Sequence, residues 1–263
     1  MKEALKLEIT HFDLVFNLPY FFETFKHFLV RDRKEITITA HLGNVYDENA
    51  QKTRKSRSLK LIQYTFDSMI EKLNINYVDV GLLQLVANLD DYRNMIKKGN
   101  LEYLKQLKKD GKIRAMGTSG HDPALLKKII ENSEFDVVMY TLNFITGNLD
   151  STKKLIETCK KNQVALIAIK TFLRGKVFSS KKRNYPAYMS SGNNISMKLD
   201  NPATPAQCIN YALDLGENSV VSGVRSIDEL KMNVKLYQSE KESKSYADIA
   251  SEFENTLYMA KQI

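Results

Sequence analysis

The chain has 263 residues, of which 43% are hydrophobic and 27% are charged, so it can bury a substantial core as one globular domain spanning residues 1–263. Its apolar runs are too short to span a membrane, and its first residues lack the apolar core of a secretory leader, so neither a membrane protein nor a secreted one is expected. The net charge of +8 is spread along the chain. The densest basic runs, Lys52–Arg57 and Lys181–Arg183, lack the interleaved aromatics of a nucleic-acid reader, so we expect solvated surface there.

The two cysteines, Cys159 and Cys208, lie far apart in the chain and have no spacing typical of a zinc or iron–sulfur site. They predict neither a disulfide framework nor a structural metal. A protein of the reducing cytoplasm fits this cysteine usage.

Short apolar runs rich in β-branched residues alternate with longer stretches of helical period, which is typical of parallel strands joined by helical crossovers. The predicted strands are Thr10–Phe16, Glu35–Leu42, Tyr77–Leu85, Ile113–Ser119, Phe135–Asn143, Val164–Phe172 and Ser219–Val224. The predicted helices are Leu59–Leu73, Tyr92–Lys109, Pro123–Glu131, Ser151–Lys161, Pro205–Leu215 and Ile227–Tyr237.

This alternation indicates an α/β domain, either a closed barrel or an open doubly wound sheet. The dinucleotide-binding version of the open sheet lacks support, because no G-x-G-x-x-G follows a predicted strand and no phosphate-binding P-loop motif occurs. The segment Lys176–Thr204, with two prolines and a Ser-Ser-Gly-Asn-Asn run, is predicted to be a loop or lid over the functional face of a barrel.

Several motifs resemble those of the aldo-keto reductase family. The strongest is Gly111–His121, G-K-I-R-A-M-G-T-S-G-H, which is similar to the family's G-K-I-R-x-[IL]-G-x-S-x-[HF]. Further matches follow in the family's order, at Leu73–Val80, Leu101–Lys108, Asn143, Val164–Lys176 and Val221–Asn233. The details are nearest a bacterial and archaeal branch that often carries iron–sulfur cysteines, a cluster that is absent from this sequence. The resemblance implies a TIM-type (β/α) barrel.

In the family, a tyrosine donates a proton to the substrate carbonyl. A lysine lowers the pKa of that tyrosine, an aspartate pairs with the lysine, and a histidine orients the substrate oxygen. NADPH supplies the hydride. Asp13 matches the aspartate, whereas His41 stands where the lysine is expected and Gln84 where the histidine is expected. The tyrosine falls on Leu18 without a gap, or on Tyr20 with a slip of two residues.

Asp13 and His41 could form a carboxylate–imidazole pair that moves a proton near neutral pH, and Gln84 could donate a hydrogen bond to a carbonyl oxygen. The alternative is that Asp13 pairs locally and His41 is an ordinary strand-end residue. We take Asp13, His41 and Gln84 as the candidate catalytic residues.

The resemblance also implies a nicotinamide cofactor, NADP or NAD. The candidate cofactor-binding residues are Ser119, Asn143, Lys170, Gly175, Gly223, Arg225, Ser226 and Asn233. Among them, Gly223–Asn233 resembles the family's phosphate-binding helix start, where backbone amides receive an anion. Glu229 stands where a residue near the 2′-phosphate is expected, and a carboxylate there repels that phosphate. Lys170, like His121, could also act as an acid, a base or an anion anchor.

The family's first barrel strand has no counterpart, because the segment Lys2–Leu7 already resembles the helix that follows it. We therefore expect an incomplete barrel of seven strands, with exposed edges at the Thr10 and Ser219 strands. We predict that the gap between these two edge strands is narrowed, is covered by the terminal helix Tyr246–Lys261, or is closed by pairing with a second copy in a homo-oligomer.

Two functions of different class remain open. The first is an NAD(P)(H)-dependent oxidoreductase acting on a small carbonyl substrate through a degenerate catalytic tetrad. The second is a catalytically inactive homologue that binds a nucleotide or a protein partner. The barrel fold by itself does not choose between them.

Overall fold

The computed structural model describes residues 1–185, 194–216, 218–239 and 246–260, and these divide into two compact units. The first unit contains Met1–Gly120 and Glu134–Val137, and the second contains His121–Ser133 and the chain from Val138 onward. We describe each unit by itself.

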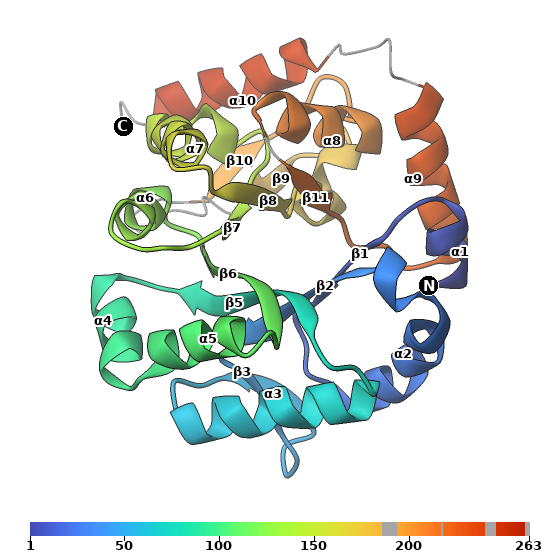
Figure 1. Cartoon of the computed structure of the whole chain (residues 1–263). Helices are drawn as coiled ribbons and strands as arrows, with labels where there is room; N and C mark the ends of the chain where they lie inside the picture. Colours follow the sequence, from blue (N-terminus) through green and yellow to red (C-terminus); the bar gives the residue numbers. More distant parts are fainter. Residues whose placement is uncertain (186–193, 217, 240–245, 261–263) are drawn as a thin grey trace. The chain divides into compact units, whose positions relative to one another are not determined.

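The first unit is built on four parallel strands in the order β1-β2-β5-β6. Its elements are α1 (Lys2–Lys6), β1 (His11–Leu14), α2 (Pro19–Asp32), a 3₁₀ turn (Arg33–Glu35), β2 (Thr37–Leu42), β3 (Asn44–Asp47), β4 (Lys52–Lys55), α3 (Leu59–Leu73), β5 (Val78–Val86), α4 (Leu89–Lys97), α5 (Asn100–Lys109) and β6 (Ile113–Gly120). Helices α2 and α3 pack against each other (Figure 1).

Two features of this unit differ from the sequence prediction. The stretch predicted as one helix, Tyr92–Lys109, is two helices, because Gly99 adopts a left-handed conformation (φ 79°) that ends the helical path between α4 and α5. Helix α2 and the β3–β4 hairpin were not predicted. The hairpin strand Lys52–Lys55 pairs with Asn44–Asp47 in an antiparallel register.

The second unit contributes the strands β7-β8-β11 in that order. Its elements are α6 (Pro123–Glu131), β7 (Val137–Thr141), a 3₁₀ turn (Thr146–Asn148), α7 (Asp150–Lys161), β8 (Ala165–Ile169), a kinked 3₁₀ segment (Leu173–Phe178), β9 (Arg183–Tyr185), β10 (Ile195–Met197), α8 (Pro205–Asp214), β11 (Ser219–Val221), α9 (Ile227–Ser239) and α10 (Ala247–Ala260). Helix α6 begins at Pro123, as predicted, and the Asp122 carboxylate caps it by accepting the amides of Ala124 and Leu125.

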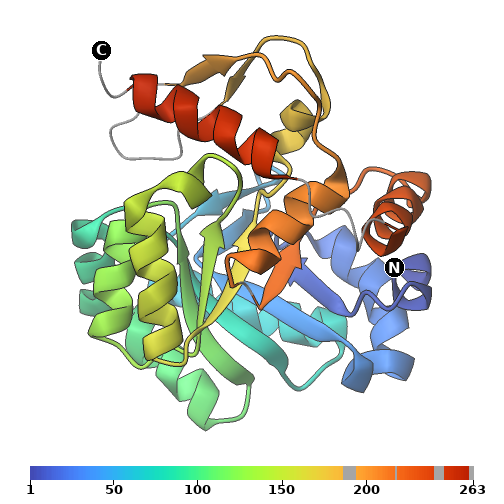
Figure 2. The same cartoon turned by 90° about the horizontal axis from the view of Figure 1, so that it is seen from above.

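The segment predicted as a loop or lid has more structure than expected. Within it, β9 and β10 form an antiparallel pair, although residues 186–193 of that segment lie outside the described part. Tyr185 and Ile195 are buried in a cluster with Phe253 of α10, which lies beside the two strands in Figure 2. The described parts of this segment therefore belong to a packed core. That α10 also covers the gap between the two edge strands stays a prediction.

Along the whole sheet the seven strands follow chain order, and the registered pairs β1–β2, β2–β5, β5–β6 and β8–β11 are all parallel. This confirms the predicted (β/α) barrel with seven of its eight strands. Strands β1 and β11 lie at the two ends of this strand order, as predicted.

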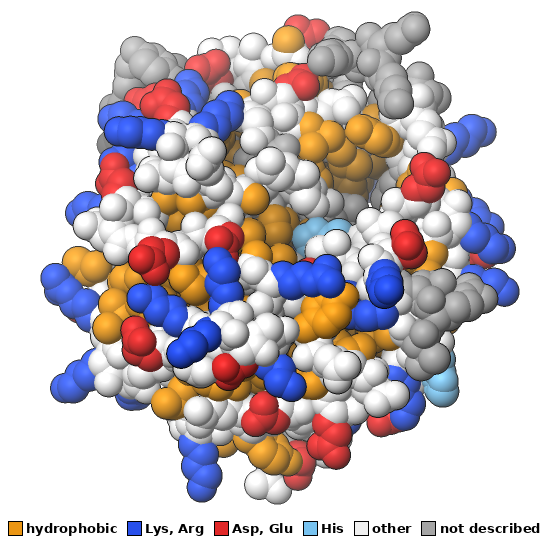
Figure 3. Space-filling view, in the orientation of Figure 1, with side chains coloured by type: hydrophobic (Ala, Val, Ile, Leu, Met, Phe, Trp, Pro, Cys, Tyr) orange, Lys and Arg blue, Asp and Glu red, His pale blue; other side chains and the backbone are white. Residues whose placement is uncertain are grey.

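Charged side chains are mixed on the surface. On the face in Figure 3, Lys and Arg side chains are interspersed with acidic ones and do not form one basic patch. Among the described helices, none combines the length and the apolar character that a membrane crossing requires.

Candidate functional site

Asp13 and His41 form a hydrogen-bonded pair in the first unit. The two residues lie near the carboxyl ends of the adjacent strands β1 and β2, where Asp13 is in register with Thr39. His41 Nε2 is 2.7 Å from Asp13 Oδ1, and both side chains are nearly buried, with 4% and 11% of their surface exposed. The predicted carboxylate–imidazole pair is therefore present.

This pair leaves the other imidazole nitrogen without a partner. A carboxylate only accepts, so the hydrogen on Nε2 must point to Asp13, and Nδ1 then carries a lone pair when the ring is neutral. Nδ1 of His41 is buried and has no hydrogen-bond partner among the described residues. A buried polar atom left unpaired costs about 1–3 kcal/mol, which is offset when a ligand or a water molecule satisfies it.

Gln84 and Ser119 lie on the next two strands of the same unit. The side-chain oxygen Oε1 of Gln84 is also buried without a partner in the described part of the chain. The hydroxyl of Ser119 accepts the amide of Leu85 at 2.9 Å, so Ser119 links β6 to the end of β5. Gln84 thus has an unsatisfied polar atom, whereas Ser119 has a structural contact.

The expected tyrosine does not join this pair. Tyr20 lies at the start of α2 with 70% of its surface exposed, and no described hydrogen bond links its hydroxyl to Asp13 or His41. His11, two residues before Asp13, bonds Thr39 through Nε2 at 2.8 Å. Burial lowers the pKa of His11, although Asp13 opposes this effect, so the ring is neutral near pH 7.

Arg57 holds the backbone beside Gln84, and its burial corrects the expectation of a solvated basic run. Its guanidinium donates to the carbonyls of Gln84 and Leu85 at 2.8 and 3.0 Å and to the Asp91 carboxylate at 2.9 and 2.7 Å. The Arg57 side chain is only 7% exposed. A local sequence pattern does not reveal this role, because Asp91 is 34 residues away.

We expect Asp91→Asn to destabilise the protein by about 3 kcal/mol at pH 7, because it leaves the Arg57 charge buried without its carboxylate. Burial raises the pKa of Asp91, but hydrogen bonds from Arg57 and Lys55 outweigh burial and hold that pKa well below its usual range. The stabilisation is therefore complete above the unfolded carboxyl pKa of about 3.9 and is lost as pH falls towards the folded value.

Urea unfolding of both proteins at pH 7 and pH 3 measures this effect, and the variant should lose less stability on acidification than the wild type does. The matched control is Asp90→Asn, because the Asp90 side chain is 89% exposed and its ion pair with Arg93 lies on the surface. Equal losses for the two variants would contradict the assignment.

Asn143 and Lys170 lie just beyond β7 and β8 in the second unit. The Asn143 carboxamide oxygen accepts the amides of Ile145 and Thr146, and its Nδ2 donates to the Lys170 carbonyl at 3.3 Å. Lys170 Nζ lies 2.6 Å from His121 Nε2. The side chain of Asn143 therefore organises a turn, and Lys170 pairs with the second histidine that the sequence singled out.

The remaining cofactor candidates lie on two segments of this unit. Gly175 has φ 77°, and among the described residues a Cβ added there would meet Phe178 alone, at 3.9 Å, while a Cβ at Gly223 would meet none of them within 4 Å. Arg225 is exposed, and Asn233 is buried on α9. The open backbone at the two glycines and the exposed cation fit a phosphate-containing ligand.

The start of α9 is capped by its own side chains. The Ser226 hydroxyl accepts the Glu229 amide at 3.1 Å, and the Glu229 carboxylate accepts the Arg225 amide at 2.7 Å. A carboxylate therefore uses a donor that an anion at this helix start would need. The sequence indicated a charge conflict at Glu229, but not this hydrogen bond.

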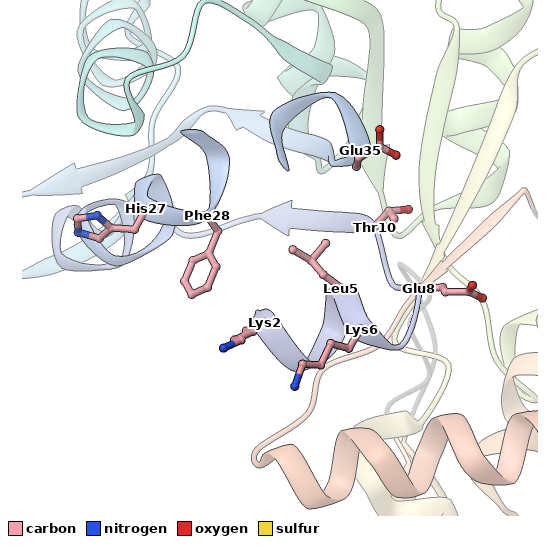
Figure 4. Close-up of a pocket in the computed structure, with 8 residues that line it drawn as sticks. All are labelled: Lys2, Leu5, Lys6, Glu8, Thr10, His27, Phe28 and Glu35. Carbon is pink, nitrogen blue, oxygen red and sulfur yellow. The ribbon is translucent and has the colours of Figure 1, made fainter. Parts of the chain in front are cut away.

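The first unit also contains a pocket of about 740 Å³. It is lined by α1, by His27 and Phe28 of α2, and by Thr10 just before β1, as Figure 4 shows. None of the predicted site residues lines it. In the described ranges, no group of three or more His, Cys, Asp and Glu side chains is arranged to hold a metal ion.

The parallel strands in chain order, with polar side chains at their carboxyl ends, define a (β/α)-barrel protein. The family model described as "Aldo/keto reductase family" matches residues 1–252. The chain belongs to the aldo/keto reductase family. A comparison with curated proteins gives no match.

Solved structures of aldo-keto reductases share the fold. The holo form of aldo-keto reductase AKR11C1 from Bacillus halodurans is 19% identical, with a TM-score of 0.68 over 89% of this chain and 78% of that one. Glycerol dehydrogenase AKR11B4 from Gluconobacter oxydans is 18% identical, with a TM-score of 0.66 over 98% and 84%. Aldo-keto reductase AKR2E5, solved in complex with NADPH, is 19% identical, with a TM-score of 0.59 over 97% and 77%.

Proposed function

We propose that this protein is a nicotinamide-dependent oxidoreductase that interconverts a small carbonyl compound and its alcohol. The observation that carries the proposal is the buried Asp13–His41 pair with an unpartnered Nδ1 on His41. Such a pair supplies a general acid or base without the family's tyrosine.

In this proposal, Asp13 fixes the imidazole tautomer through Nε2, and the protonated Nδ1 of His41 gives its proton to the alkoxide that forms during reduction. In the reverse direction the neutral Nδ1 accepts that proton. Gln84 orients the carbonyl oxygen through its amide N–H, while its buried Oε1 accepts a substrate hydroxyl or a water molecule. The bound nicotinamide supplies the hydride.

Within the second unit, we assign the nucleotide contacts to Asn143, Lys170 and the glycine-containing segments around Gly175 and Gly223, with Arg225 as the cation for a phosphate. Ser119 of the first unit stays a prediction from the sequence. AKR2E5 in its NADPH complex supports a nicotinamide cofactor. The Glu229 carboxylate at the start of α9 disfavours an additional phosphate there. We therefore expect NADH to bind more tightly than NADPH.

An inactive homologue that binds a nucleotide or a protein is the second candidate. One observation favours it, namely the self-capping of α9 by Ser226 and Glu229, which uses amide donors that a cofactor phosphate would otherwise engage. If cofactor affinity is lost, the chain keeps the reductase fold but acts by binding a partner, without catalysis.

A titration with NADH and NADPH, followed by thermal stability and by nicotinamide fluorescence, tests the proposal. A ligand at 100 times its dissociation constant stabilises the folded state by about 2.7 kcal/mol, so a saturable rise in melting temperature is expected. Arg225→Glu should remove most of this rise, because it replaces the cation with an anion.

The matched control is Lys235→Glu, which makes the same charge change at an exposed position on the same helix. It should leave the titration nearly unchanged. If neither nucleotide raises the melting temperature at millimolar concentration, the oxidoreductase proposal is wrong, and of the second candidate only the protein-binding form stands.

A further inference from the structure

Lys170 has an unusual backbone and a basic neighbour. It follows β8 directly and adopts a left-handed conformation (φ 58°), which is uncommon for a residue other than glycine. Strained residues of this kind persist where the surrounding structure holds them, and they cluster at functional sites. Lys170 Nζ lies 2.6 Å from His121 Nε2, and both residues are only partly exposed.

The surroundings of this pair favour its uncharged forms. Burial lowers the pKa of Lys170, and the nearby Arg174 guanidinium lowers it further. Burial, reinforced by the charge of Lys170, lowers the pKa of His121 to about 4. At neutral pH His121 is therefore an imidazole with Nε2 available to accept a hydrogen from the lysine.

A nucleophilic amine needs three things. It must sit within hydrogen-bond reach of a base, it must lose its proton more readily than a surface lysine does, and solvent or substrate must reach it. The contact between Lys170 and His121 meets the first condition, burial and the Arg174 charge meet the second, and the partial exposure of Lys170 meets the third.

We propose that Lys170 is an amine nucleophile that condenses with a small aldehyde or ketone to form an imine, with His121 as the proton-exchanging partner. The Nζ lone pair attacks the carbonyl carbon, the C–N bond forms and the carbonyl π bond opens to an oxyanion, while the nitrogen gives a proton to His121. That proton passes to the oxygen and gives a carbinolamine. A second proton, taken from solvent through His121, converts its hydroxyl into departing water as C=N forms, and the resulting iminium nitrogen returns one proton to solvent to give the neutral imine. The step needs no redox partner and is reversible.

This inference does not rest on the proposed nicotinamide chemistry. It uses residues of one unit only, and it predicts covalent reactivity in the protein without nucleotide. The same carbonyl class is a substrate for both reactions, but only the imine reaction modifies the protein.

Reductive trapping of the imine tests the proposed reaction of Lys170. The nucleotide-free protein is incubated at pH 7 with propionaldehyde and sodium cyanoborohydride, which reduces imines, and labelled peptides are quantified by mass spectrometry. Lys170 should be labelled about tenfold faster than Lys153, an exposed lysine on α7, because burial and the nearby Arg174 charge lower the pKa of the Lys170 amine and favour its uncharged, nucleophilic form.

Two variants locate the reactivity. Lys170→Arg should abolish the fast label while labelling of Lys153 continues, and His121→Gln should slow labelling of Lys170 by about tenfold, since the proton acceptor is lost. The comparison of Lys170 with Lys153 in the wild-type protein needs no variant, so it stands even if a substitution impairs folding. Labelling of Lys170 no faster than Lys153 overturns the proposal, and so does fast labelling that persists in a folded His121→Gln protein.

The trapping result and the nucleotide titration can fail separately. Fast labelling without nucleotide binding would leave the amine chemistry as the activity of this barrel. Nucleotide binding without fast labelling would refute the imine step and leave the oxidoreductase proposal unchanged.

Discussion

Replacing His41 with glutamine should lower kcat/KM for NADH-dependent reduction of benzaldehyde by about 100-fold or more, the range typical for loss of a positioned acid or base. Glutamine is close to histidine in size and can still reach the Asp13 carboxylate, but it cannot carry a proton at the position of Nδ1. The measurement is steady-state reduction followed by nicotinamide absorbance, with cofactor affinity checked separately. Affinity for the nucleotide should be unchanged.

The control for this experiment is His27→Gln, at an exposed position on α2. It should retain wild-type kinetics. Asp13→Asn should reproduce most of the loss, because the amide lets the imidazole ring adopt the wrong tautomer. Full activity in a folded His41→Gln protein would show that His41 is not the proton donor.

The second large effect is expected at Gly117, within the motif that most resembles the family. Gly117→Ala should cost more than about 4 kcal/mol of folding free energy or prevent folding. An added Cβ would lie 2.1 Å from the Val137 carbonyl oxygen and 2.8 Å from Leu82, closer than atoms can approach. The neighbouring contacts allow little relaxation, because the amide of Asp136 donates to the Met116 carbonyl while the Asp136 carboxylate accepts the Met116 amide, each at 2.8 Å.

Urea unfolding, or soluble yield when the variant does not fold, measures the effect. Gly223→Ala is the matched control, because its Cβ would meet no atom of the described part of the chain within 4 Å, and it should change stability by less than about 1 kcal/mol. Similar stability for both variants would show that the backbones near Gly117 can separate without loss.

Local pattern predicted much of this chain correctly. Helix α3 spans the predicted Leu59–Leu73 and α6 the predicted Pro123–Glu131, because the apolar stripe of each helix, and the Asp122 cap of α6, are properties of the segment itself. The seven barrel strands were found for the same reason, each within a few residues of its observed ends. The helical spacing of apolar residues did not reveal the turn at Gly99, because two helices separated by a single turn still show that spacing.

The sequence by itself determined the strand set, its order and the presence of Asp13, His41 and Gln84 at the ends of strands, since parallel strands in chain order bring those ends to one edge of the sheet. Only the tertiary structure decided that Arg57 is buried against Asp91, that Glu229 caps the start of α9, and that Lys170 contacts His121. The contacts of Arg57 and Lys170 join residues 34 and 49 positions apart, and no local pattern specifies such pairs. The charge and protonation of these groups depend on that packing, because burial and neighbouring charges, rather than residue type, set their pKa values.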